Sequence, residues 1–393
     1  MSADAGKKNE RYGKISQVFT PAAPVGSVEL FAGRNAEIMK VVNVLNQPGE
    51  HVVLYGERGV GKTSIANVIA DIIMHRGGGY EALSVRVNCN TNDNFKTIWR
   101  KVFRELGIEI PDEWKYASPD PDDLRYMLSK VDPPKLIVLD EFDRIEDDEA
   151  LSLMADTIKA LSDHRTASKL VIVGVADSID QLIGEHESIQ RGISEVHVPR
   201  MDYEDCVRIV VGGLEKLDLA IVDAAQTRIA RLSEGLPHYV HWLAQKAAQR
   251  AVADDRTVLT VLDVEAATEE STKRHSLVKE YQTAIQSPRR NNLFSRVLAS
   301  CALAEKNLLG QFTSSAVREP MSRIMGRRYE IPAFARHLAE FTEEEHGSVL
   351  KKEGSERKYT YRFRNPLMQP FAIMAALSEG VIPEEYKAEL FGA

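Results

Sequence analysis

The sequence has few cysteines and no long apolar run. Only Cys89, Cys206 and Cys301 occur in 393 residues, and none forms a C-x-x-C pair or stands beside a histidine at metal-binding spacing. This spacing argues against a zinc site or a disulfide framework, so we expect reduced, mostly buried thiols. The first residues carry no apolar segment typical of a signal peptide, and no later stretch is long enough to cross a bilayer. We therefore expect a cytoplasmic protein.

Positive charge is also scarce, because 50 basic residues face 58 acidic ones and the formal net charge is −8. The chain as a whole therefore does not attract nucleic acid or acidic membranes, and any such contact needs a local basic patch. What the chain does have is 44% apolar residues, which at this length is enough for two or three domains with a core each.

Residues 29–200 alternate between apolar runs rich in Val, Ile and Leu and segments with helical periodicity. This alternation predicts a parallel five-stranded sheet with helices on both faces. The expected strands are 51–55, 83–88, 135–140, 169–175 and 195–199. Within the same region, the run of Pro and Asp at 119–123 is predicted to be a solvated loop.

The segments on either side of this region have other patterns. Residues 1–28 are polar and interrupted by Gly and Pro, which predicts an extended N-terminal arm. Residues 201–285 show only helical periodicity and predict an all-helical unit, with a linker at 286–292. Residues 293–393 read as three short helices followed by two strand-like arms around a Gly-Ser turn, which predicts a winged helix.

The most informative motif lies between the first strand and the helix that follows it. Residues 56–63 read G-x-x-x-x-G-K-T, the pattern of a phosphate-binding loop whose backbone N–H groups point at phosphate oxygens. We expect Lys62 to reach the β- and γ-phosphates and Thr63 to offer its hydroxyl to Mg²⁺. The candidate nucleotide-binding residues here are Gly56, Glu57, Arg58, Gly59, Val60, Gly61, Lys62, Thr63 and Ser64.

Two acids end the apolar strand at 135–140. Asp140 and Glu141 stand at its carboxyl end, where ligands bind in open α/β sheets. We expect Asp140 to hold Mg²⁺, directly or through water, and Glu141 to orient or deprotonate the attacking water at the γ-phosphate.

The strand at 169–175 also ends in small polar residues. Asp177, with Ser178 behind it, is a candidate to hydrogen-bond the γ-phosphate or the lytic water. The alternative is an ordinary helix cap or turn at the end of a strand.

Together these motifs resemble the AAA+ ATPases, and most closely the archaeal and eukaryotic replication-initiator branch. The segment Asp140-Glu141-Phe142-Asp143 matches the Asp-Glu-x-Asp box usual in those initiators. The segment from Phe31 to Glu37, with Arg34 inside it, resembles the one that opens the ATPase domain and contributes to the adenine pocket. The resemblance makes residues 29–200 the nucleotide-binding domain and 201–285 its helical lid, and implies ATP and Mg²⁺ as cofactors.

The resemblance further implies assembly into a ring or arc of identical subunits. In such assemblies an arginine from one subunit reaches the neighbour's γ-phosphate and stabilises the charge that develops there. Arg191, just before the last strand, stands where that residue is expected, and Arg200 is the alternative. A helix-end arginine that binds carbonyl groups is the competing explanation for Arg191.

The lid departs from the initiator pattern because no arginine occupies the turn after Glu234. Nucleotide sensing would then fall to His238 or His241, or not occur. The turn Gly235-Leu236-Pro237 is similar to one that STAND NTPases and transposition-regulator ATPases use against the nucleotide. Pro237 and His238 are therefore further candidate cofactor-binding residues.

The last domain carries a local basic surface. Its basic residues are Lys351, Lys352, Arg357, Lys358, Arg362 and Arg364 near the predicted hairpin, and Arg323, Arg327 and Arg328 near the second helix. A wing of this kind contacts DNA phosphates, and the third helix, 331–341, is the one that would enter a major groove. Only Arg336 and His337 on that helix suit base reading, so a protein-docking surface is the alternative.

Three hypotheses follow from the sequence. The first is a Mg²⁺-dependent ATPase whose nucleotide state controls assembly on DNA through the winged helix. The second is a nucleotide-switched signalling or scaffold ATPase of STAND type, for example in transposition control or phage defence, whose last domain binds a protein partner. The third is an ATP-binding structural subunit without turnover. None of the three places the protein at a membrane.

Overall fold

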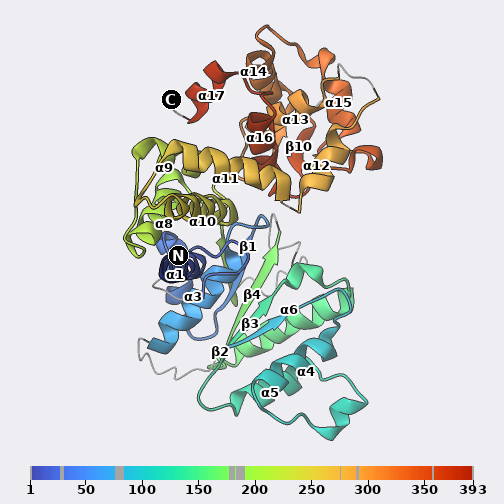
Figure 1. The fold of residues 1–393 in the computed structure, drawn as a ribbon. Helices are drawn as coiled ribbons and strands as arrows, with labels where there is room; N and C mark the ends of the chain where they lie inside the picture. The colour runs from blue at the N-terminus through green and yellow to red at the C-terminus, as the bar shows by residue number, and fades with distance from the viewer. Residues whose placement is uncertain are drawn as a thin grey trace. The chain divides into compact units, whose positions relative to one another are not determined.

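The computed structural model describes residues 2–26, 31–75, 84–176, 182, 191–274, 276–288, 292–355 and 358–391. The chain divides into two compact units, shown as a ribbon in Figure 1. We call residues 24–199 the sheet unit, and residues 1–23 together with 200–393 the helical unit. No described helix is both long and apolar enough to span a bilayer. All three cysteines are buried and free, as predicted.

The sheet unit contains a five-stranded parallel sheet with strand order β2-β3-β4-β1-β5. Its strands are β1 (His51–Gly56), β2 (Ser84–Asn88), β3 (Leu136–Asp140), β4 (Lys169–Val175) and β5 (Ile193–His197). The central strands are buried on both faces, which is why they read as continuous apolar runs rather than as alternating ones. The predicted fold class is confirmed for this sheet. The strand 169–175 is observed as predicted, three strands differ by one residue at one end, and the strand predicted at 195–199 is displaced by two residues at both ends.

Helices cover both faces of this sheet. On one face lie α2 (Asn35–Leu45) and α3 (Lys62–His75), which contact β1, and on the other lie α4 (Phe95–Glu105), α5 (Pro121–Ser129) and α6 (Asp148–Asp163). Trp99 and Phe103 of α4 are fully buried in the core of the second face. Both acids and the phosphate loop therefore lie at the carboxyl edge of a sheet fixed by packing on two sides.

The run of Pro and Asp at 119–123 is not the solvated loop predicted from its composition, because it begins α5. The Asp120 side chain accepts a hydrogen bond from the Asp123 backbone N–H at 2.8 Å, and the Asp123 side chain accepts one from the Asp120 N–H at 3.1 Å. Pro121 follows at the first helical position, where its missing N–H is not needed. The same residues that suggested a loop are thus a helix cap.

The helical unit begins with α1 and resumes after the sheet unit. Its helices are α1 (Ser2–Val18), α8 (Tyr203–Glu215), α9 (Asp223–Leu232), α10 (Pro237–Ala253), α11 (Val261–Arg274), α12 (Val278–Ile285), α13 (Phe294–Leu303), α14 (Ser314–Met325), α15 (Ala335–Glu340), α16 (Met368–Ser378) and α17 (Glu384–Phe391). Two short strands, β6 (Ala220–Ile221) and β7 (Val258–Leu259), pair in parallel within the region predicted to be all-helical. Strands of two residues are too short to leave a periodicity in the sequence.

The prediction of an extended N-terminal arm is wrong for residues 2–18, which form α1. This helix packs on α10, and Ile15 and the following Phe19 are buried. The Lys8 ammonium donates to the Ala253 carbonyl at 3.0 Å and pairs with Asp255 at 2.8 Å. Contacts with a distant helix therefore stabilise a segment whose polar composition and glycines do not favour a helix by themselves.

The C-terminal part of the helical unit holds a three-stranded sheet of order β8-β10-β9. The strands are β8 (Phe312–Thr313), β9 (Leu350–Glu353) and β10 (Thr360–Phe363), and both pairings are antiparallel. The predicted hairpin is thus present as β9 and β10. The predicted third helix, 331–341, is divided between a 3₁₀ turn at Ile331–Ala333 and α15.

Candidate functional site

The loop between β1 and α3 requires glycine at three positions. Gly56, Gly59 and Gly61 have φ of 148°, 89° and 97°. Residues with a side chain rarely adopt such angles. A Cβ on Gly56 would also lie 2.4 Å from the Val198 carbonyl oxygen. The sequence pattern therefore specifies a loop whose backbone turns in a way that other residues do not permit.

Lys62 is a buried cation at the end of this loop. Its ammonium donates to the carbonyl oxygens of Gly56 and Glu57, both at 2.9 Å, and forms no ion pair with any carboxylate in the described part of the chain. Burial lowers the pKa of Lys62 to about 8. A buried positive charge without an acid partner is costly, and an anion placed against it would offset that cost. The loop therefore fits a phosphate group.

The two hydroxyl residues at the start of α3 make different contacts. The Thr63 hydroxyl donates to Oδ2 of Asp140 at 2.9 Å. The Ser64 hydroxyl accepts a hydrogen bond from the Val25 backbone N–H at 3.1 Å. Asp140 is buried, and its Oδ1 accepts from the Glu141 N–H at 2.9 Å. A hydroxyl and a carboxylate oxygen this close together form a donor set that suits Mg²⁺, which prefers oxygen ligands.

Glu141 follows Asp140 directly but has a different environment. Its backbone is left-handed, with φ of 55°, so the chain turns sharply between the two acids. The Glu141 carboxylate is half-exposed and pairs with the Arg144 guanidinium at 3.0 Å. One acid is thus buried beside Thr63, while the next remains accessible to water.

Arg34 braces the phosphate loop. It is buried, with φ of 61°, and its guanidinium donates to the Val60 carbonyl at 3.3 Å and also to the Pro199 carbonyl. The Glu37 carboxylate pairs with it at 3.1 Å. In the described residues Arg34 therefore ties the loop to the chain after β5, and its predicted contribution to an adenine pocket stays a prediction.

Arg86 of β2 was not among the residues predicted from the sequence motifs. Its guanidinium nitrogen Nη2 lies 3.3 Å from Asp140 Oδ2. Nε donates to the Asn88 side chain at 3.2 Å and Nη1 to the Asn67 side chain at 3.1 Å. The available signal was the alternation of β2, in which Arg86 and Asn88 are exposed and alternate with the buried Val85 and Val87.

Four of the predicted residues lie elsewhere in the structure or outside the described residues. Asp177 and Ser178 lie outside the described residues. Arg191 is exposed in the turn before β5 and forms no ion pair with a described residue. Arg200 belongs to the helical unit, where its guanidinium donates to the Gln369 side chain at 2.8 Å and to the Glu234 carbonyl at 3.2 Å.

The two lid histidines, both on α10, bind the N-terminal segment. His238 Nδ1 lies 2.7 Å from the Pro21 carbonyl oxygen, and His241 Nδ1 accepts from the Thr20 N–H at 3.2 Å. Burial lowers the pKa of His241 to about 4. The described residues contain no cluster of three or more His, Cys, Asp or Glu side chains that could hold a metal ion. The observed contacts of the two histidines are with the N-terminal segment, so the predicted contact of Pro237 and His238 with nucleotide stays a prediction.

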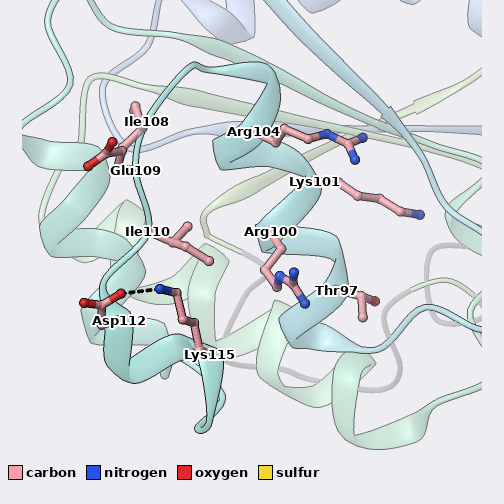
Figure 2. Close-up of a pocket in the computed structure, with 9 residues that line it drawn as sticks. All are labelled: Thr97, Arg100, Lys101, Arg104, Ile108, Glu109, Ile110, Asp112 and Lys115. Atoms are coloured by element: carbon pink, nitrogen blue, oxygen red, sulfur yellow. Dashed lines mark hydrogen bonds and ion pairs between the residues drawn. The ribbon is translucent and has the colours of Figure 1, made fainter.

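A separate groove of about 670 Å³ lies between α4 and the segment that follows it, as Figure 2 shows. Arg100, Lys101, Arg104 and Lys115 line it, but three of these four cations already pair with acids. None of the predicted nucleotide-binding residues lines this groove. The candidate site is therefore the loop region and not this groove.

Comparisons with known proteins agree with this assignment. Residues 46–183 match the family model described as an AAA domain. No curated protein matches the chain. Among solved structures, a Walker-type ATPase of Pyrococcus abyssi is 14% identical with a TM-score of 0.52, and the match covers 90% of this chain and 99% of that one.

Two archaeal proteins match over a similar length. The ORC2 protein of Aeropyrum pernix is 15% identical with a TM-score of 0.48, covering 94% of this chain and 98% of that one. The ORC1 protein of the same organism, solved in complex with DNA, is 16% identical with a TM-score of 0.48, covering 92% and 94%. At these identities the comparison with the Pyrococcus protein supports the fold alone.

Proposed function

We propose that this chain, in which residues 46–183 form an AAA domain, is an ATPase that binds and hydrolyses ATP with Mg²⁺. The observation that carries the proposal is the buried Lys62 ammonium, whose hydrogen-bond partners among the described residues are two carbonyl groups and which stands at the end of a glycine loop. The contact between Thr63 and Asp140 supplies the neighbouring metal ligands. Mg²⁺ bound there would neutralise charge on the phosphates.

Each residue of the proposed site has a role that suits its environment. Lys62 and the loop backbone hold the phosphates, while Thr63 and Asp140 hold the metal. Glu141, half-exposed and one residue beyond, orients the attacking water or accepts its proton. Asp177 is proposed to contact the γ-phosphate or that water. Arg34 keeps the loop in place through Val60.

We propose further that the active form is an assembly in which Arg191 acts on a neighbouring copy. Gly192, the next residue, accepts a hydrogen bond from the His51 N–H at the beginning of β1. The phosphate loop begins at the other end of that strand, about 17 Å away at the usual rise of a strand. That span is longer than an arginine side chain, so Arg191 does not reach the phosphate site of its own subunit. Arg200 is already bound to Gln369 and Glu234, which makes it the weaker candidate.

Replacing Arg191 with alanine is expected to lower ATP turnover by about 10³-fold, the lower end of what an arginine contributed by a neighbour supplies. ATP affinity is expected to stay within a few-fold of wild type, because the residue is absent from its own site. Turnover of wild type, measured over a range of protein concentrations, should rise with assembly. Unchanged turnover of the variant under conditions that favour assembly would show that Arg191 has no such role.

The C-terminal region is proposed to be a winged helix that contacts DNA backbone. Lys351 and Arg362 both pair with Glu353, at 2.8 and 3.0 Å. Lys352 and Lys358, by contrast, are exposed and pair with no carboxylate in the described residues, although Lys352 stacks on the Tyr359 ring at 3.6 Å. Unpaired lysines on a wing suit phosphate contacts.

The third-helix region is less suited to reading bases. Arg336 pairs with Glu340 at 2.8 Å, and His337 packs edge-on against Phe294. Contacts to the phosphate backbone, which carry no sequence information, are therefore the better-supported mode.

The double substitution Lys352→Ala/Lys358→Ala tests this mode. DNA affinity is expected to fall uniformly across sequences, and the slope of log affinity against log salt to decrease by about 2, since each phosphate contact contributes about one unit. Lys351→Ala is the matched control and should change the slope less, because Lys351 already pairs with Glu353. Fluorescence anisotropy over a salt series measures both. A flat salt response of the wild type would contradict the DNA proposal.

A nucleotide-switched scaffold remains the second candidate. The turn Gly235-Leu236-Pro237 favours it, because it is similar to a turn of STAND NTPases. In this turn Gly235, at φ of 71°, accepts a hydrogen bond from the Met201 N–H just before α10 begins. The overall negative charge favours a protein partner as well. This function predicts nucleotide-dependent retention of a stoichiometric protein and no retention of DNA, so the same salt series separates the two.

A further inference from the structure

Arg86 is held beside the proposed metal ligand by three elements of the sheet unit. Asn67 lies on α3, four residues after Thr63 and on the same face of the helix. Asn88 lies two residues further along β2 and is in register with Asp140 of β3. The two amide oxygens bind Nε and Nη1, which leaves Nη2 facing Asp140 Oδ2 at 3.3 Å.

The two charged partners differ in exposure. The Asp140 side chain is 4% exposed and that of Arg86 is 34% exposed. A buried carboxylate beside a phosphate site repels an incoming nucleotide unless a cation neutralises it. Arg86 is the ion-pair partner that the described residues give to Asp140.

We propose that Arg86 is a positioning residue that substitutes in part for Mg²⁺ at Asp140, so that nucleotide binding depends less on the metal. The proposal rests on the proposed ATP site and adds to it a role for a residue outside both sequence motifs. In the absence of metal, the guanidinium offsets the Asp140 charge and the phosphates bind against a less negative surface. With a metal held by Thr63 and Asp140, the charge of the metal would offset that of Asp140 and Arg86 would contribute little.

The test compares affinities with and without metal. Binding of a fluorescent ATP analogue to the full chain is measured in EDTA and in saturating Mg²⁺. For Arg86→Gln we expect affinity in EDTA to fall about 10-fold and affinity in Mg²⁺ to change less than about 3-fold. The reason is that the Arg86 charge is needed to offset the Asp140 charge near the phosphates only when the metal is absent. The ratio of the affinity in Mg²⁺ to the affinity in EDTA is therefore expected to be higher for the variant than for wild type.

Three further variants make the result specific. Arg86→Lys keeps the charge and is expected to retain affinity in EDTA to within about 3-fold of wild type. Asn67→Leu removes one anchor of the guanidinium and is expected to give a smaller loss of the same kind. Arg104→Gln, which removes an exposed arginine of the same unit that pairs with Glu105, is the control and should leave both affinities unchanged.

The outcomes separate the proposal from its premise. An equal loss in EDTA and in Mg²⁺ for Arg86→Gln would indicate a purely structural role and overturn the proposal, as would no change in either. Failure of Arg86→Lys to retain affinity in EDTA would show that charge is not the cause. Absence of ATP binding by the wild type in Mg²⁺ would instead overturn the proposed function.

Discussion

Replacing Lys62 with alanine is expected to lower ATP affinity by about 100-fold or more. Hydrogen bonds from a charged donor are worth about 1.5–3 kcal/mol each, and the Lys62 ammonium is the buried cation of the loop. Its present partners are two carbonyls of the same loop, and the other cation of the loop, Arg58, is exposed, so Lys62 is the buried charged partner that phosphate oxygens would gain. Isothermal titration with ATP and Mg²⁺ measures the loss directly.

The fold of this variant is expected to survive. Lys62 forms no ion pair with a described carboxylate, so removing it breaks no buried salt bridge, and the nearby Asp140 keeps Arg86 as its partner. Wild type with ATP at about 100 times its dissociation constant should gain roughly 2.7 kcal/mol of stability, which the variant should lack in thermal melts. Lys159→Ala, an exposed lysine of α6, is the control for loss of charge. Equal ATP stabilisation of wild type and Lys62→Ala would contradict the assigned site.

The nucleotide-binding sheet and its loop were predictable because their signals are local. The strand at 135–140 reads as a buried run, and the glycines at 56, 59 and 61 are required by backbone angles that only glycine adopts readily. The pairing of Thr63 with Asp140, 77 residues apart, was also implied, since Asp140 ends one parallel strand and Thr63 lies at the start of the helix that follows the loop after another.

Other features were not predictable, because they depend on contacts that a sequence does not display. The helix α1 owes its stability to α10, which lies more than two hundred residues later. Arg86 looks like any exposed residue of an edge strand until the register of β2 with β3 places it near Asp140. The run of Pro and Asp at 119–123 was recognised in the sequence, but it was interpreted as a loop and not as a helix start capped by Asp120.

Replacing Glu141 with glutamine is expected to reduce ATP hydrolysis by about 10²–10⁴-fold, the usual contribution of a general base, while ATP remains bound. Binding should persist because, in the proposed site, Lys62 and the loop contact the phosphates and Thr63 and Asp140 hold the metal. The Glu141–Arg144 pair is half-exposed on both sides, so its loss should cost little stability. Phosphate release and retention of labelled ATP measure the two effects separately.

Two comparisons decide what that result means. Glu146→Gln, an exposed acid five residues further on, should keep wild-type turnover and so control for loss of charge. Asp140→Asn should behave differently from Glu141→Gln, since it removes a metal ligand and lowers nucleotide affinity in Mg²⁺ as well as turnover. If Glu141→Gln releases phosphate as fast as wild type, the catalytic assignment is wrong. A wild type that releases none would instead favour an ATP-binding subunit without turnover, in which the assembled state is set by binding alone.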